Sequence, residues 1–328
     1  MSVSAYVLVG CTASGKTSVS NELARRTGAI VLSADSMLVY RGMDIGTAKP
    51  SPAESAGVDL RGVDLADPDE PFSTGRWLED ARRVFAEAQA AGRDVIVAGG
   101  TGLYVTALLR GLDAPASDPA IRAELEAQLR KEGPGALLAR AEALRPGSTD
   151  GIDRANPRRV VRLLEILLSG AAEGTSAREC ETPKTPIAGL AHAPTVLHAR
   201  IESRARTMFR EGLLDEVRAL RDRFPAFRPL PRGTEPTPSP EKSVPITAAG
   251  GIGYAEAAAV LDGTLSVEEA IAQTALRTRR LAKRQNTWWR NQWPVEWIPG
   301  PADEADVPRA ADAVWEFWNR HGKTPVAL

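Results

Sequence analysis

The sequence has few cysteines and histidines, the residues that form disulfides in small secreted proteins or bind structural metals. Only two of its 328 residues are cysteine, Cys11 and Cys180, so neither a disulfide framework nor a cysteine zinc site is supported, and both thiols are expected to be free. The histidines have no metal-ligand spacing, so we assign them no chemistry. They are His192, His198 and His321.

Long hydrophobic runs are also missing. No apolar run is long enough to span a bilayer, and residues 6–9 follow the start with no basic flank, which is typical of a first core strand rather than of a signal peptide. We therefore expect the chain to stay in the cytoplasm and to have no membrane partner. We also expect a monomer. The 43% hydrophobic and 25% charged residues are those of an ordinary globular protein.

An excess of positive charge is missing as well. The formal net charge is −1, which by itself gives no reason to expect a nucleic-acid partner. The basic residues are nevertheless clustered, at 158–162, 200–206 and 277–290. Such clusters suit phosphate contacts, although solvated helix faces have the same composition.

Short apolar runs alternate with helical patterns in the first part of the chain. Strands are predicted at 6–9, 30–33 and 95–98, and helices at 16–26 and 84–91. This alternation is typical of a parallel sheet flanked by helices. The expected fold class is therefore α/β.

The later part reads as mostly helical. Residues 119–170 carry apolar residues at helical spacing, 171–194 reads as a polar connector, and 200–221 and 267–290 read as long helices. The proline-rich stretch 224–245 predicts a loop. We expect four segments: 1–115 as the first part of the core, 116–170 as a helical insertion that binds the acceptor, 171–300 as the rest of the core, and 301–328 as a C-terminal helix.

The strongest motif is a phosphate-binding loop directly after the first strand. It fits G-x-x-x-x-G-K-[ST] and consists of Gly10, Cys11, Thr12, Ala13, Ser14, Gly15, Lys16 and Thr17. Its backbone amides and the following helix N-terminus attract phosphate, Lys16 adds a positive charge, and Thr17 can ligate Mg²⁺. The motif therefore predicts a site that holds a polyphosphate.

The position of the nearest carboxylate argues against ATP hydrolysis. ATPases and kinases of this class place an Asp at the end of a neighbouring strand to hold Mg²⁺, but the strand 95–98 is followed by Gly99 and Gly100. Asp35, after the strand 30–33, reaches the same sheet edge. That position suits a base that acts on an acceptor, and a turn residue is the alternative.

Several long motifs together resemble the tRNA dimethylallyltransferase family. They are the phosphate loop, DSMLVYRGMDIGTAKP at 35–50, GGTGLY at 99–104, SDPAIR at 117–122, NPRRVVR at 156–162, IGY at 252–254 and KRQNTWWR at 283–290. They occur in the family's order over about residues 6–297. Their length makes the resemblance far more specific than a phosphate loop alone.

The resemblance implies a prenyltransferase. It would move a dimethylallyl group from dimethylallyl diphosphate to N6 of adenosine 37, the nucleotide after the anticodon of tRNA, with Mg²⁺ and release of diphosphate. Asp35 would be the general base, Thr101 would position the acceptor, and Arg204 would assist the phosphate loop. The acceptor side would comprise Ser36, Met37, Leu38, Arg122, Arg158, Arg159, Arg162, Gly253, Tyr254, Lys283, Arg284, Gln285 and Arg290.

The chain departs from the family in acceptor-side segments. It has Leu60 and Arg61 where the family has a histidine pair, Asp153 and Arg154 where it has His-Pro, and Ala255 where it has Lys, Arg or Gln. A related prenyltransferase that acts on a free adenine nucleotide or another small nitrogen heterocycle is therefore the alternative. A phosphate-loop kinase or NTPase and a non-enzymatic RNA-binding protein are two further alternatives.

Overall fold

The chain forms two compact units. The computed structural model describes residues 3–111, 118–154, 156–169, 186–225, 227, 229 and 248–328. One unit comprises Met1–Gly111 and Thr182–Leu328, and we call it the core unit; the other, the helical unit, is Leu112–Glu181. The segment 116–170 lies in the helical unit, and the C-terminal helix belongs to the core unit.

The core unit is organised by a mostly parallel sheet. Its described strands are β1 (Ser4–Gly10), β2 (Ile30–Ser33), β3 (Asp59–Arg61), β4 (Val95–Gly99), β5 (Ile187–Ala191), β6 (Val295–Pro299) and β7 (Thr324–Pro325). The order is β3-β2-β4-β1-β5-β6 with parallel neighbours, and β7 pairs antiparallel with β1. The carboxyl ends of β1, β2, β4 and β5 therefore meet at one edge, where open α/β sheets bind ligands.

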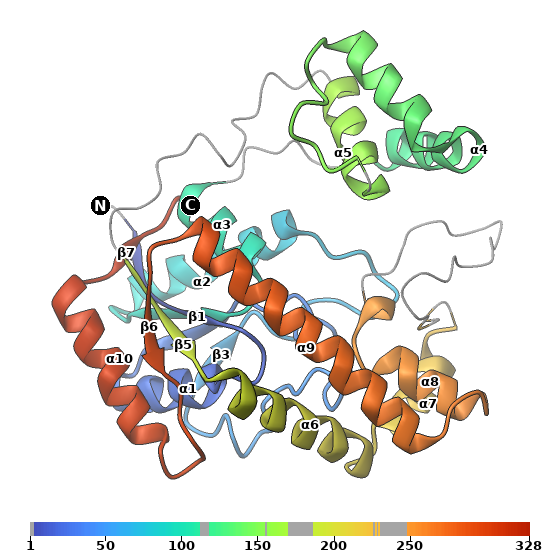
Figure 1. Cartoon of the computed structure of the whole chain (residues 1–328). Helices are drawn as coiled ribbons and strands as arrows, with labels where there is room; N and C mark the ends of the chain where they lie inside the picture. The colour runs from blue at the N-terminus through green and yellow to red at the C-terminus, as the bar shows by residue number, and fades with distance from the viewer. Residues whose placement is uncertain are drawn as a thin grey trace. The chain divides into compact units, whose positions relative to one another are not determined.

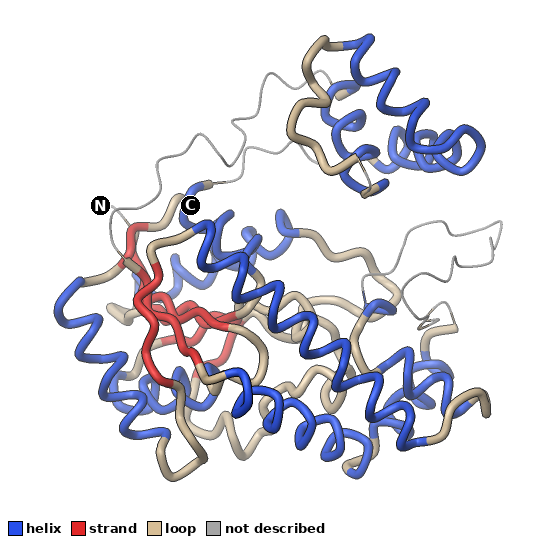
Figure 2. The backbone as a smooth tube through the Cα atoms, viewed as in Figure 1, coloured by secondary structure: helices blue, strands red, loops and turns tan. Residues whose placement is uncertain are grey.

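Helices enclose this sheet, as Figures 1 and 2 show. The described helices of the core unit are α1 (Lys16–Thr27), α2 (Thr74–Ala90), α3 (Gly102–Arg110), α6 (Pro194–Arg210), α7 (Leu213–Arg223), α8 (Tyr254–Leu261), α9 (Val267–Gln292) and α10 (Val307–His321), with a 3-10 turn at Ala248–Gly250. None of the described helices combines the length and the hydropathy that a membrane crossing requires.

One face of the sheet packs against α1 and α10. Because strand side chains alternate between faces, Leu8, Val31 and Ile96 point to the same side, where they join one buried cluster with residues of both helices. Leu8 stands between the small residues Ala98 of β4 and Ala188 of β5. Because α1 begins at Lys16, shortly after β1 ends at Gly10, its N-terminus lies near the carboxyl end of β1.

The long helix α9 runs past the sheet and reaches the phosphate loop (Figure 1). It begins with a capping box in which Ser266 Oγ accepts from Glu269 N (3.3 Å) and Glu269 Oε2 accepts from Ser266 N (2.8 Å). Further along, Arg277 donates to the carboxylate of Glu256 on α8, which is only 3% exposed. This ion pair joins α8 to α9.

The helical unit consists of α4 (Pro119–Leu144) and α5 (Pro157–Leu168). Gly133, with φ 77°, and the following proline kink α4, so its two halves fold against α5. Leu125, Leu137, Val160 and Leu164 form the buried contact between the helices. Both helices lie within the segment 116–170, where the sequence leads us to expect a helical insertion.

Most elements predicted from the sequence are confirmed, including the strands at 6–9, 30–33 and 95–98 and the helices at 16–26 and 267–290. The helix predicted at 84–91 is longer and begins at Thr74, where Ser73 Oγ accepts from Arg76 N. The loop predicted at 224–245 lies mostly outside the described residues.

Two predictions are wrong. The expected single helix at 200–221 is two helices, because Gly212 at the start of α7 has φ 106°, a left-handed conformation that interrupts a right-handed helix. The expected connector at 171–194 contains β5, an interior strand. Its sequence IAGLA has a single β-branched residue, so its intrinsic strand signal is weak and only the neighbours β1 and β6 define it.

The ion pair between α8 and α9 should contribute to stability. We expect Arg277→Leu to lower the free energy of unfolding by about 3 kcal/mol, because it leaves the Glu256 carboxylate buried without its cation. Urea unfolding followed by tryptophan fluorescence measures this. The control is Glu268→Ala, which removes an ion pair with Arg206 that water screens, so its effect should be much smaller. Equal effects of the two changes would contradict the role of the buried pair.

Candidate active site

The phosphate loop runs from the end of β1 into the first turn of α1. Gly15 is the N-cap of α1, no side chain caps the helix, and the first turn carries no acidic residue. The first N–H groups of α1 therefore stay available to a ligand, and the helix dipole adds positive potential there. Lys16 and Thr17 are the first two residues of the helix.

Lys16 lies under this loop with its charge poorly solvated. Its Nζ donates to Cys11 O (2.7 Å) and lies 3.5 Å from Ser14 Oγ. Burial lowers the pKa of Lys16 to about 8, against the opposing effects of Cys11 and Asp35, and nearby Arg204 lowers it further. The loop therefore surrounds an ammonium group whose hydrogen-bonding partners, Cys11 O and Ser14 Oγ, carry no full negative charge.

Two arginines of α6 complete the cationic side. Arg200 and Arg204 are four residues apart on the helix and line the same pocket. Burial, followed by the charge of Arg200, lowers the pKa of Arg204. Arg200 itself was not predicted as a site residue, although its helical spacing from Arg204 could have indicated it.

Arg200 both lines the pocket and supports the phosphate loop. Its Nε donates to Ala13 O (3.0 Å), and its Nη1 donates to Pro301 O (3.0 Å) and Ala302 O (2.9 Å). His192, just after β5, donates from Nε2 to Ser14 O (3.2 Å), and burial lowers its pKa. These contacts give the Ala13 and Ser14 carbonyls hydrogen-bond donors and so fix the conformation of the loop.

Asp35 stands at the carboxyl end of β2. Its Oδ1 accepts from Met37 N (2.9 Å), which forms the tight turn after the strand. The turn is tied to the loop after β4, since Thr101 N donates to Ala34 O (3.0 Å) and Thr101 Oγ1 accepts from Ser36 N (3.0 Å). The structure thus brings Asp35 and Thr101 together through hydrogen bonds.

Lys16, Arg200, Arg204 and Asp35 line one cavity of about 120 Å³, which we call the phosphate-loop pocket. It is lined by Thr12, Ala13, Ser14, Gly15, Lys16, Thr17, Ser18, Ser20, Asn21, Val31, Ser33, Asp35, Leu38, Thr47, Ala48, Pro50, Leu60, Ala98, Gly99, Arg200 and Arg204. Of these described lining residues, Asp35 alone has a carboxylate. Gly99 occupies the strand end where an ATPase has its magnesium acid.

Gln285 of α9 joins two loops of the site. Its Oε1 accepts from Thr12 N (2.8 Å) and its Nε2 donates to Gly100 O (3.1 Å). The sequence placed Gln285 near acceptor bases and Thr12 at the phosphates. In the structure the Gln285 side chain is used to link the phosphate loop to the loop that carries Thr101, and the Thr12 amide points to Gln285.

Other predicted acceptor residues are distributed over both units. Lys283, Arg284 and Arg290 are exposed on α9 of the core unit. Arg158 and Arg159 are exposed on α5 of the helical unit. Arg162, also on α5, pairs at 2.9 Å with the buried carboxylate of Glu165, which lies 3.9 Å from Arg122.

Tyr254 is not available to an acceptor in this structure. It follows Gly253 at the start of α8, is 0% exposed, and donates its hydroxyl to Glu216 (2.7 Å). The prediction that it lies near bases is therefore corrected. Its burial depends on Gly46 and Glu216, which are far from it in sequence, so the local motif could not reveal it.

No group of His, Cys, Asp and Glu side chains among the described residues could hold a metal ion by itself. Thr17 is exposed in the first turn of α1 and lines the pocket together with Asp35. A hydroxyl and one carboxylate are hard oxygen ligands, which suits a cation whose other ligands come from phosphate and water.

Known proteins agree with this architecture. Residues 38–292 match the IPP transferase family, and residues 3–66 match the isopentenyl transferase family. A tRNA dimethylallyltransferase of Anaeromyxobacter dehalogenans is 43% identical over 308 residues, which cover 92% of this chain and 95% of that protein. One of Methylococcus capsulatus is 39% identical over 91% of this chain and 94% of its own.

Solved structures give the same result. The full-length tRNA isopentenylpyrophosphate transferase of Bacillus halodurans superposes with a TM-score of 0.65 at 33% identity, covering 97% of this chain and 98% of that one. A eukaryotic dimethylallyltransferase acting on tRNA has a TM-score of 0.73 at 20% identity, covering 99% and 81%, and shows a likeness of fold. With a family match that runs from residue 38 to residue 292, the chain belongs to the IPP transferase family.

Proposed function

We propose that this chain transfers a dimethylallyl group from dimethylallyl diphosphate to N6 of adenosine 37 in tRNA and releases diphosphate. The observation that carries the proposal is the phosphate-loop pocket, which combines half-buried, poorly solvated cations with the single carboxylate of Asp35. A prenyl diphosphate needs the cations for its leaving group, and a nucleic-acid amine needs a base. Both requirements are met within one cavity.

The cations of the pocket would stabilise the leaving diphosphate. Lys16, the first N–H groups of α1 and Arg204 would neutralise the charge that develops as the bond from carbon to diphosphate oxygen breaks. Mg²⁺ held by Thr17 and the phosphate oxygens would supply further charge neutralisation. Because these groups already line the pocket before the ligand arrives, little reorganisation is needed during the reaction.

Asp35 would act as the base for the acceptor amine. An exocyclic adenine amine is a weak nucleophile, since its lone pair is delocalised into the ring. As the new bond from nitrogen to carbon forms, the amine loses a proton, which Asp35 would accept. Thr101 is held beside Asp35 through Ser36 and Ala34, so it would position the amine against the carboxylate. The base would leave the helical stack to reach the pocket.

The choice of tRNA over a small acceptor rests on exposed cations outside the pocket. Arg158 and Arg159 in the helical unit, and Lys283, Arg284 and Arg290 in the core unit, would contact phosphates of the anticodon arm. A free nucleotide has too few phosphate groups to contact all of these cations. The relatives, by their names, act on tRNA, which also supports this choice.

Binding of the prenyl diphosphate should take up a proton at alkaline pH. The free protein holds the pKa of Lys16 at about 8, so above this pH the amine is mostly neutral. A diphosphate favours the ammonium form, so titration calorimetry in buffers of different ionisation enthalpy should show uptake approaching about one proton per ligand. Uptake should decrease as the pH falls below 8. Lys16→Arg, which stays charged, should abolish this part, and unchanged uptake in that variant would contradict the assignment.

Asp35→Asn should remove the base and retain the pocket. We expect the single-turnover rate of prenyl transfer to fall by about 10²–10⁴, with little change in affinity for the prenyl diphosphate. Rapid-quench assays with labelled substrate measure this. Asp67→Asn, a carboxylate paired with Arg41 outside the pocket, is the control. Near-normal transfer by Asp35→Asn would show that another group takes the proton.

Binding of an anticodon stem-loop should depend steeply on salt. Arg159→Ala combined with Arg284→Ala should weaken it and reduce the slope of log Kd against log salt by about 1.5, as expected when two phosphate contacts are lost. Arg320→Ala, an exposed cation on α10, is the control. Efficient prenylation of AMP, with unmodified tRNA left untouched at low salt, would replace this proposal with the small-molecule alternative.

A further inference from the structure

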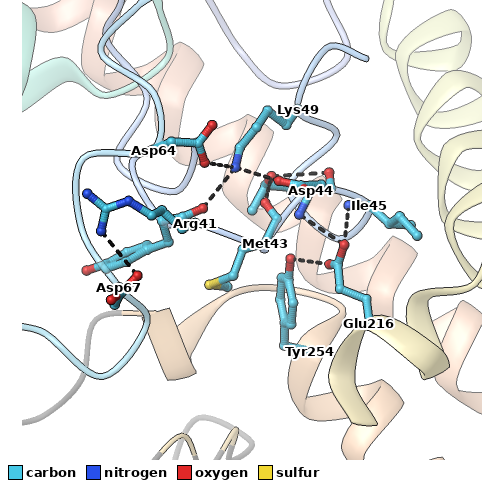
Figure 3. A network of polar contacts seen from close by, with 11 residues as sticks. Arg41, Met43, Asp44, Ile45, Lys49, Asp64, Asp67, Glu216 and Tyr254 are labelled. Atoms are coloured by element: carbon cyan, nitrogen blue, oxygen red, sulfur yellow. Dashed lines mark hydrogen bonds and ion pairs between the residues drawn. The ribbon is translucent and has the colours of Figure 1, made fainter. Parts of the chain in front are cut away.

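The carboxylate of Glu216 on α7 binds a backbone loop. It accepts hydrogen bonds from three consecutive N–H groups, those of Asp44 (3.0 Å), Ile45 (2.7 Å) and Gly46 (3.1 Å), and a fourth from Tyr254 Oη (2.7 Å) (Figure 3). All four partners are donors, and a carboxylate has only acceptors. Such charge-assisted bonds are about twice as strong as neutral ones.

Tyr254 fixes the same loop by packing. Its ring lies against Gly46, where an added Cβ would come within 2.5 Å of the ring, so the backbone of the loop rests directly against the ring. Burial, followed by the charge of Glu216, raises the pKa of Tyr254 well above its usual value, so its hydroxyl remains a proton donor. Glu216 and Tyr254 therefore act as one clasp on residues 44–46.

The other end of the loop is held by Lys49. Its side chain is 8% exposed, and Nζ donates to Tyr40 O (2.9 Å), Asp44 Oδ1 (2.6 Å) and Asp64 Oδ1 (2.6 Å). Within the loop, Lys49 N donates to Asp44 O (2.9 Å). The segment 44–49 is thus a closed turn with fixed ends (Figure 3).

This turn forms one wall of the phosphate-loop pocket. Thr47 and Ala48, between the two fixed ends, line the pocket, as does Pro50 just beyond. Ala48 has φ 52°, a conformation that is costly for a residue with a side chain and needs support from its surroundings. The clasp at 44–46 provides that support from a helix that does not line the pocket.

We propose that Glu216, assisted by Tyr254, is a positioning residue for the prenyl diphosphate. By clasping residues 44–46 it keeps Thr47 and Ala48 in the form that closes the pocket wall. The inference rests on the proposed function of that pocket. Its consequence is that the affinity for prenyl diphosphate depends on a carboxylate that never touches it.

The test compares Glu216→Gln with Asp215→Asn, its exposed neighbour on α7. Glutamine presents an NH₂ group to one of the loop donors, so the wall spends less time in its closed form, and the apparent affinity falls by that fraction. We expect the KM for dimethylallyl diphosphate to rise about tenfold, with kcat and the KM for tRNA changed less than about twofold. Hydrogen exchange of the 44–46 amides should accelerate. Asp215→Asn should change none of these quantities.

Tyr254→Phe is the second variant, because it removes one hydroxyl and keeps the ring under Gly46. Its KM for the diphosphate should rise about threefold, in proportion to the single hydrogen bond lost. If Glu216→Gln does not fold, this variant decides. An unchanged KM in the variant that folds, or a loss confined to thermal stability and active fraction, overturns the proposal.

Lys16→Ala separates this inference from the proposed function. If Lys16→Ala abolishes binding of the diphosphate and Glu216→Gln leaves its KM unchanged, the clasp inference fails and the pocket assignment stands. If Lys16→Ala binds the diphosphate normally, the pocket assignment itself fails, and the proposed function fails with it.

Discussion

Two half-buried cations, Lys16 and Arg204, share the phosphate-loop pocket, and the rest of the site depends on keeping them there. Burial lowers the pKa values of both Lys16 and Arg204, and Arg204 lowers that of Lys16 further. Asp35 opposes both shifts but is a single carboxylate. Like charges in a poorly solvated space repel, so the free site is electrostatically under-compensated. A ligand with several anionic oxygens relieves this, which is why the pocket suits a diphosphate better than a neutral group.

The conformation of the phosphate loop depends on segments that are distant from it in the sequence. Buried backbone carbonyls need hydrogen-bond donors. Arg200 supplies one to Ala13 O and His192 supplies one to Ser14 O, while Gln285 occupies the amide of Thr12. These residues come from α6, the end of β5 and α9. The first 27 residues therefore encode the loop, but the later elements give it its working conformation.

Features that depend on residues close together in the sequence could be predicted. Features that depend on contacts between residues far apart in the sequence could not. The phosphate loop is a contiguous motif, and Asp35 follows from the rule that parallel strands end at one edge, so both were predictable. β5 was not, since IAGLA becomes a strand only between β1 and β6. Glu216 was not either, because it lies 172 residues from its partner Asp44. Tyr254 was misread for the same reason: Gly46 and Glu216, which bury it, are outside its motif.

The arginines of the helical unit differ in whether a buried carboxylate holds them. Arg162 is held by Glu165, which is 1% exposed, and Arg122 lies near the same carboxylate, whereas Arg158 and Arg159 extend into solvent. An arginine held in one rotamer loses less conformational entropy on binding a phosphate, but part of its charge is already compensated. Exposed arginines keep their full charge and lose more entropy. Under the proposed function, the helical unit's share of the affinity and of its salt dependence should therefore come mainly from the exposed pair, and the geometry of its contact mainly from the arginines beside Glu165.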